Sequence, residues 1–216
     1  MTQTQLAPRG PFLACAAVAL AAFAIVAVDV QIAGRAGWDR TVFRWLYAGA
    51  TKGPPGAAPN DSPLLKALLP ALNRLSDVRA LALLFLAIAV GLCVGRRRRY
   101  AAFFLAAIAV TLSSAALKHA FASPLPFPSS EAGSFPSGHA MASMAAVAAI
   151  VVLLAPTRLR WPSVVGGAAF VAGVGVAVVA DGGHWPSDVL AGWSLALAWV
   201  CLLGALFGLP AHRRPT

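Results

Sequence analysis

Long uncharged apolar segments alternate with short polar segments along this chain. A run of about 18 or more apolar residues has the length of a helix that crosses the hydrocarbon core of a membrane. Segments that approach or exceed this length cover residues 11–30, 78–95, 100–118, 139–156, 161–180 and 187–209. The pattern predicts an all-α integral membrane protein whose six transmembrane helices form a single bundle, with residues 1–216 as one domain.

The first predicted span follows Arg9, so a cleaved signal peptide is the alternative interpretation of residues 11–30. No clear cleavage site made of small residues follows this segment directly. We therefore expect a retained helix.

Two amphipathic segments lie between the first and second predicted spans. Residues 38–47 place Trp38, Val42 and Trp45 near one helical face, with Asp39 and other charged residues elsewhere. This pattern is typical of a helix that lies in the headgroup region of a membrane. After a break at residues 53–56, residues 64–75 predict a second interfacial helix.

Composition supports a membrane protein and changes the meaning of the charge. Hydrophobic residues make up 59% of the chain and charged residues 11%, and the mean hydropathy is +0.77. The net charge of +10 also suits a nucleic-acid-binding protein, but in membrane proteins Lys and Arg more often fix orientation and contact anionic lipid. We therefore expect the lipid bilayer, and no nucleic acid, as a partner.

The positive charges are distributed unevenly over the predicted loops. If the N-terminus is cytoplasmic, the inner segments hold nine of the 17 Lys and Arg residues and none of the seven acids. These cations are Arg9, Arg96, Arg97, Arg98, Arg99, Arg158, Arg160, Arg213 and Arg214. This asymmetry predicts a bacterial-type inner or plasma membrane protein with both termini in the cytoplasm. It also places Lys118, His139 and His184 together on the extracytoplasmic face.

The segment Pro136-Ser137-Gly138-His139 opens the fourth predicted span. The free N–H groups of a helix N-terminus bind phosphate-like anions. Ser137 can cap this helix, and Gly138 lets a ligand approach the backbone closely. An ordinary helix cap beside a histidine at the membrane boundary is the alternative interpretation.

His184 and Asp188 are separated by four residues at the start of the sixth predicted span. If the first turn of that helix includes both, the carboxylate can orient one ring nitrogen and leave the other as a nucleophile or base. For Asp188, a helix N-cap is the alternative, and Asp181 is expected to be a turn residue. We expect no metal from His139 and these three residues, because an Asp in a flexible loop is a poor ligand.

Three blocks of sequence together resemble the signature of the type 2 phosphatidic acid phosphatase superfamily, over roughly residues 75–208. The blocks are Lys118, the segment Phe135-Pro136-Ser137-Gly138-His139, and the segment His184-Trp185-Pro186-Ser187-Asp188-Val189-Leu190-Ala191-Gly192. The resemblance implies a six-helix membrane enzyme that removes phosphate from lipid phosphates and diphosphates without a metal or other cofactor.

The resemblance also implies a role for each matching residue. His184 would attack phosphorus to form a phosphohistidine, Asp188 would orient His184, and His139 would protonate the leaving oxygen. The phosphoryl oxygens would be held by Lys118, Ser137 and Gly138.

The chain departs from the family pattern at two arginine positions. Leu125 stands where the first block has an Arg, and Val178 stands where the third block has an Arg six residues before the nucleophile. A single well-placed Arg contributes roughly 10³ to 10⁵ in rate in other phosphoryl-transfer enzymes. We therefore expect another outer cation at the site, with Arg79 first and Arg74 second; Arg35 is a further possibility.

The expected function is a lipid phosphate phosphatase that acts on a polyprenyl or glycerolipid phosphate or diphosphate at the extracytoplasmic face. A lipid phosphotransferase and a catalytically impaired protein that binds or transports a lipid phosphate are the alternatives. The presence of Lys118, both histidines and Asp188 favours chemistry, since a site without activity would not need His184 and Asp188 in register.

Overall fold

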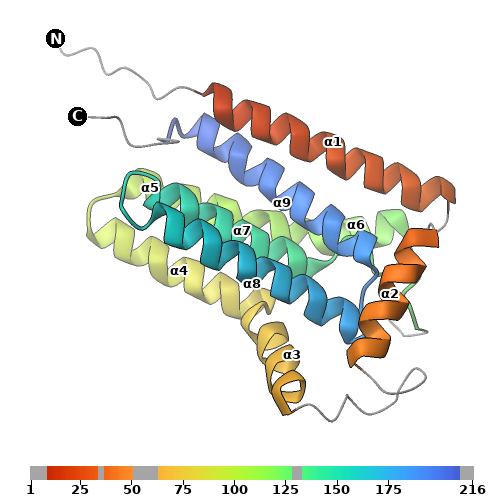
Figure 1. Cartoon of the computed structure of the whole chain (residues 1–216). Coiled ribbons are helices and arrows are strands. Elements are labelled where there is room, and N and C mark those ends of the chain that lie inside the picture. Colours follow the sequence, from red (N-terminus) through yellow and green to blue (C-terminus); the bar gives the residue numbers. More distant parts are fainter. Residues whose placement is uncertain (1–8, 34–36, 51–62, 128–132, 210–216) are drawn as a thin grey trace.

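The computed structural model describes residues 9–33, 37–50, 63–127 and 133–209, and the regular elements within these ranges are all helices (Figure 1). Six of the helical segments coincide with the predicted spans. They are α1 (Gly10–Ala33), α4 (Val78–Val94), the continuous α5 (Arg98–Ile108), η1 (Ala109–Leu112) and α6 (Ser113–Phe121), α7 (Gly138–Leu154), α8 (Arg160–Ala180) and α9 (Pro186–Leu206).

Four of these segments in the described part of the chain are long and apolar enough to cross a membrane. They are α1, the α5–α6 segment, α8 and α9. Helix α4 follows α3 (Pro63–Leu75) after a bend of 53°, and the two together satisfy the same test as a broken span. Helix α7 is apolar but has only 17 residues. An integral membrane bundle is therefore supported, while six crossings stay a prediction.

The two amphipathic segments are helical, as predicted. Helix α2 (Gly37–Ala50) exposes 75% of Trp45 together with much of Trp38 and Val42, and it buries Phe43. Helix α3 contains Pro70 and exposes Leu64, Leu68 and Leu75. Exposed apolar side chains on short helices suit the headgroup layer of a membrane.

Small residues allow the central helices to approach one another closely. Helix α7 packs against α8 and α9, and its buried face contains Ala142, Ala145 and Ala149. Helix α1 lies along α9, where a Cβ on Gly204 would stand 2.7 Å from Cε1 of Phe12. Because lipid tails are as apolar as the helices, close van der Waals contact between small residues is a main source of association in membranes.

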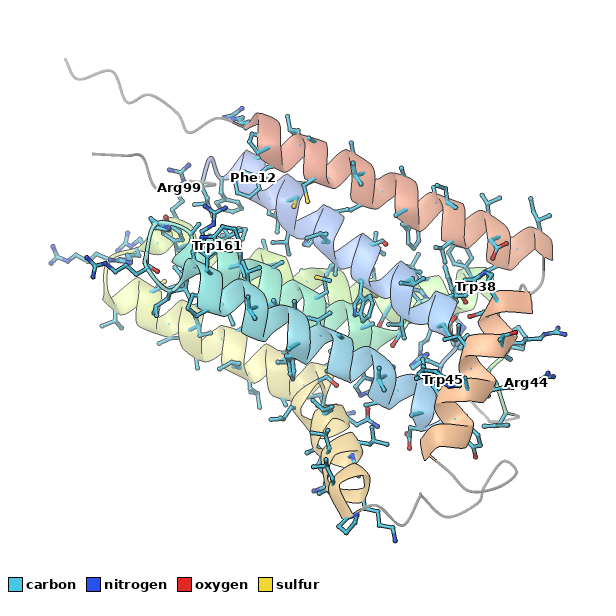
Figure 2. All side chains as sticks on the ribbon, in the orientation of Figure 1. Phe12, Trp38, Arg44, Trp45, Arg99 and Trp161 are labelled. Carbon is cyan, nitrogen blue, oxygen red and sulfur yellow. The ribbon has the colours of Figure 1, made fainter. Side chains whose placement is uncertain are left out.

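The histidines and the described cations that are predicted to be cytoplasmic lie at opposite ends of the bundle. The α4–α5 turn, the α7–α8 turn, the start of α1 and the end of α9 gather at one end of the bundle (Figure 1). Arg99 and Trp161 mark this end, whereas Trp38, Arg44 and Trp45 on α2 mark the opposite end (Figure 2). His139 and His184 lie at the start of α7 and just before α9, at the α2 end. Arg35, Arg213 and Arg214 lie outside the described residues.

Candidate active site

The N-terminus of α7 has the predicted serine cap. Ser137 is the N-cap residue, and its side-chain oxygen accepts a hydrogen bond from the backbone N–H of Ala140 at 3.4 Å. Gly138 is the first residue of the helix, and a Cβ there would stand 3.6 Å from Oγ of Ser114 and 3.9 Å from Cγ2 of Val78. The N-terminal end of α7 is therefore bordered by α6 and by the start of α4.

His184 and Asp188 face each other, but not within one helical turn as predicted. Helix α9 begins at Pro186, so His184 lies in the preceding loop, where Pro fixes the first helical position. Oδ2 of Asp188 lies 3.5 Å from Nδ1 of His184. It also accepts a hydrogen bond from the backbone N–H of Trp185 at 2.8 Å. Asp188 thus supports the start of α9 from the third helical position, whereas the N-cap residue is Trp185 and not Asp188 as the alternative had it. The orienting role of Asp188 toward His184 stays a prediction.

The His184–Asp188 pair is shielded from solvent. Asp188 is fully buried, and 8% of His184 is exposed. Nδ1 of His184 has no hydrogen-bond partner among the described residues, and its 3.5 Å separation from Oδ2 of Asp188 is longer than an ordinary N–H···O hydrogen bond.

The two histidine-containing segments meet at this end of the bundle. The backbone N–H of Ser137 donates a hydrogen bond to the main-chain carbonyl of Asp188 at 3.0 Å. The segments that carry His139 and His184 are therefore adjacent at the starts of α7 and α9. That Lys118, His139 and His184 form one site stays a prediction.

The loop between α6 and α7 folds back against the end of α6. The backbone N–H of Ser134 donates to the carbonyl of Ser123 at 3.0 Å, and a Cβ on Gly133 would stand 3.0 Å from the carbonyl oxygen of Lys118. The indole N–H of Trp185 donates to the carbonyl of Pro124 at 3.0 Å. The segment that precedes Leu125 is therefore tied to the loop that carries His184. Residues 128–132, including Glu131, lie outside the described residues.

Asp39 is a site residue that the sequence pattern did not identify. Its side chain on α2 is 1% exposed, and both of its carboxylate oxygens bind Ser187. Oδ1 accepts from the backbone N–H of Ser187 at 2.9 Å, and Oδ2 accepts from the Ser187 hydroxyl at 2.7 Å. The available signal was that Asp39 shares a helical face with Phe43, four residues later, and not with the exposed tryptophans.

Aromatic side chains cover the loop that carries His184. The ring centroids of Phe43 and Trp185 are 5.0 Å apart, and those of Tyr47 and Phe127 are 5.2 Å apart. Beneath them Gly182 has a φ of 81°, and a Cβ there would stand 2.7 Å from Cε2 of Phe127. Asp181 ends α8 beside this glycine, in agreement with its prediction as a turn residue.

Apolar side chains occupy the two positions where the family pattern has arginine. Val178 is 3% exposed and belongs to a buried cluster with Ala140 and Val189, the residues that follow His139 and Asp188. Position 178 is therefore beside the site, and it is apolar. Leu125 is half-buried in the loop after α6.

The two candidate replacement cations lie at the corner between α3 and α4. Arg79 is exposed in the first turn of α4, and its backbone N–H donates to Oδ1 of the Asp77 cap at 2.9 Å. Its neighbour Val78 borders Gly138, which places this turn beside the start of α7. Arg74 is exposed at the end of α3.

Of the residues that the structure describes, the histidines belong neither to a metal cluster nor to the apolar cavity among α1, α7, α8 and α9. In the described part of the chain, no group of three or more His, Cys, Asp and Glu side chains is placed to hold a metal ion. A cavity of about 620 Å³ lies among α1, α7, α8 and α9, and its lining is apolar apart from Arg160 and a few weakly polar side chains. It includes neither His139 nor His184, so the candidate chemistry is at the helix ends and not in this cavity.

Comparisons with known proteins agree with the arrangement of the helices. The model of the PAP2 superfamily matches residues 99–208. The fold is similar to the crystal structure of the first transmembrane PAP2 type phosphatidylglycerolphosphate phosphatase from Bacillus subtilis, with a TM-score of 0.69. The similarity covers 88% of this chain and 94% of that chain at 20% sequence identity, which establishes likeness of fold. No curated protein matches the sequence.

Proposed function

The chain belongs to the PAP2 superfamily, and from this premise we propose that it is a membrane-embedded lipid phosphate phosphatase. Its substrate is a polyprenyl or glycerolipid phosphate or diphosphate of the bilayer, and hydrolysis takes place at the extracytoplasmic face. The observation that carries the proposal is the buried pair of His184 and Asp188, with Oδ2 3.5 Å from Nδ1, next to the capped N-terminus of α7.

Asp188 selects the nitrogen that reacts. A carboxylate facing Nδ1 favours the tautomer in which Nδ1 carries the proton, so the lone pair is on Nε2. The same carboxylate stabilises the positive charge that develops on the ring when Nε2 bonds to phosphorus. Burial strengthens this interaction, because the local dielectric is lower than that of water.

The reaction then proceeds in two steps. In the first step a bond forms between Nε2 of His184 and phosphorus, and the bond from phosphorus to the leaving oxygen breaks. This oxygen is the lipid oxygen of a monophosphate or the bridging oxygen of a diphosphate, and protonated His139 gives its proton to it. In the second step water attacks the phosphohistidine, His139 takes a proton from the water, and the bond between nitrogen and phosphorus breaks. Inorganic phosphate leaves, and both histidines return to their starting states.

The phosphoryl oxygens need positive charge throughout both steps. The N–H groups at the start of α7 and the dipole of that helix supply part of it. Gly138 leaves the backbone accessible, and Lys118 in the last turn of α6 contributes a full charge. Preorganised donors of this kind lower the barrier because they do not have to reorient during the reaction.

A second candidate function follows from the apolar side chains at positions 125 and 178. Without a guanidinium at either position, the site could bind a lipid phosphate for transport, or transfer the phosphoryl group to an acceptor other than water. Phosphate release separates these functions from the proposed hydrolysis.

The test is a phosphate-release assay on purified protein in lipid nanodiscs. The panel consists of phosphatidic acid, phosphatidylglycerol phosphate, and a polyprenyl monophosphate and diphosphate. We expect release from at least one lipid, loss of release in His184→Ala, and no change in His119→Ala, since His119 is exposed on α6. Absence of release from every lipid, or full activity in His184→Ala, would contradict the proposal.

A further inference from the structure

We propose that Asp39 is a positioning residue for the reaction, which holds the catalytic end of α9 in register through Ser187. The inference rests on the proposed phosphatase function and adds a residue that belongs to none of the three family blocks. Asp39 comes from α2, outside the residues 99–208 that match the family model.

A buried carboxylate is retained only where hydrogen bonds compensate for its lost hydration. Asp39 is 1% exposed, and it receives two hydrogen bonds of 2.9 and 2.7 Å from a single residue, Ser187. Hydrogen bonds to a charged group are roughly twice as strong as those between neutral groups. The N-terminal turn of α9 also favours a nearby negative charge. The contact is therefore a strong and specific attachment of α2 to this turn.

The attachment acts at the residue next to the reacting pair. Ser187 directly precedes Asp188, whose Oδ2 binds the backbone of Trp185 and faces Nδ1 of His184. A shift of Ser187 therefore shifts Asp188 and the loop that carries His184 together. A displacement of about 1 Å in a catalytic group lowers the rate by roughly 10², and the 3.5 Å separation of His184 and Asp188 leaves little margin.

Apolar packing holds α2 in place without Asp39. Phe43 is buried against Trp185, with ring centroids 5.0 Å apart, and it also contacts Tyr47 and Phe127. Loss of the carboxylate should therefore leave α2 docked and the protein folded. The specific loss should be the register of the first turn of α9.

The experiment measures formation of the phosphohistidine in the first turnover. Radiolabelled phosphatidic acid and a radiolabelled polyprenyl diphosphate, each in excess, are mixed in parallel with a known, limiting amount of protein, and the reaction is quenched at increasing times. The amplitude reports the fraction of folded, binding-competent protein, and the rate constant reports the chemical step. A residue needed only for folding would lower the amplitude, whereas a positioning residue lowers the rate constant.

For Asp39→Ala we expect a rate constant about 10² lower at unchanged amplitude and unchanged half-saturating lipid concentration. Asp39→Asn should lose less than Asp39→Ala, because an amide can accept from the Ser187 N–H and donate to its hydroxyl oxygen. The double variant Asp39→Ala with Ser187→Ala should be no slower than the slower single variant, since both residues act through one contact. The control Asp29→Ala, which removes a half-buried acid on α1, should react like the wild type.

Three results would overturn the inference. An unchanged rate constant in Asp39→Ala, or a fall in amplitude alone, would show that Asp39 has no part in positioning. Additive losses in the double variant would show that Asp39 does not act through Ser187. Failure of the wild type itself to form a phosphohistidine with either lipid would instead refute the proposed function, and the role of Asp39 with it.

Discussion

The backbone N–H of Ser137 donates a hydrogen bond to the main-chain carbonyl of Asp188 at 3.0 Å. This bond joins the start of α7 to the first turn of α9, which supports the proposed nucleophile His184. Gly192 lies one turn after Asp188 and allows the two helices to approach. A Cβ at Gly192 would stand 2.8 Å from the carbonyl oxygen of Ser137 and 3.0 Å from Cβ of Ala140.

We expect Gly192→Ala to impair both stability and turnover. The atom nearest to the added Cβ is the backbone oxygen of Ser137, which no side-chain rotation can move. Helices α7 and α9 must therefore separate at the site. Overpacking of this kind destabilises a protein by about 1–3 kcal/mol, and we expect kcat/KM to fall at least about tenfold with the changed geometry. Thermal unfolding in detergent and phosphate release measure the two effects.

Gly91→Ala is the matched control for this substitution. Gly91 is also inside an apolar helix, α4, but a Cβ there meets nothing within 4 Å. It should behave like the wild type or be slightly more stable, because Ala is the better helix former. Equal behaviour of the two variants would mean that the contact between α7 and α9 does not set the site geometry.

The helices could be predicted from sequence because hydropathy and helix boundary signals are local. Ser137 and Pro186 mark the starts of α7 and α9, and the charge pattern predicted that His139 and His184 lie at the same end of the bundle. The contact of Asp39 with Ser187 could not be predicted, because the two residues are 148 positions apart and the contact depends on how α2 docks. The bend between α3 and α4 is likewise a tertiary feature, which a one-dimensional pattern does not contain.

Asp188→Asn should lower turnover by on the order of 10³ while the fold stays intact. The amide oxygen can still accept the Trp185 N–H, so the start of α9 keeps its cap. The negative charge that stabilises the developing positive charge on His184 is lost, as in the equivalent change in serine proteases. Single-turnover rates together with the unfolding temperature test this. Activity within a few-fold of wild type would remove Asp188 from the mechanism.

A chelator should leave phosphate release unchanged. In the proposed reaction His184 is the nucleophile and protein groups supply the positive charge, so no step needs a divalent ion. The measurement is phosphate release before and after EDTA dialysis, with added Mg²⁺ or Zn²⁺ as the comparison. Inactivation that a metal ion reverses would restore the alternative of a metal site at His139, His184, Asp181 and Asp188.

Cysteine labelling should place the two ends of the bundle on opposite sides of the membrane. In a background with Cys15, Cys93 and Cys201 replaced by Ala, an impermeant maleimide should label Arg44→Cys in intact cells. Arg98→Cys should react only after the membrane is opened. Both positions are exposed, on α2 and α5 respectively. Labelling of both variants from the same side would refute the proposed orientation.

The absent arginines give a prediction about the native cations. Phosphoryl oxygens in a pocket of low dielectric need compensating charge, and Lys118 with the start of α7 supplies only part of it. Arg79 is the first candidate because the turn that carries it borders Gly138 through Val78. We expect Arg79→Ala to lower kcat/KM by about 10². Arg97→Ala, at the other end of the bundle, serves as the control and should have no effect; Arg74→Ala tests the second candidate.

Restoring the arginines tests the same requirement from the opposite direction. Val178 packs with Ala140 and Val189, so an Arg at 178 would begin beside the first turns of α7 and α9. Leu125 is half-buried in the loop tied to Trp185, where a longer side chain disturbs less packing. We expect Leu125→Arg alone to raise phosphate release and the double variant with Val178→Arg to raise it further, provided that unfolding temperatures stay near wild type. Three negative results together would contradict hydrolysis: no effect of Arg79→Ala or Arg74→Ala on kcat/KM, no gain in the arginine variants, and no phosphate from any lipid in the panel. The site would then bind a lipid phosphate without hydrolysing it.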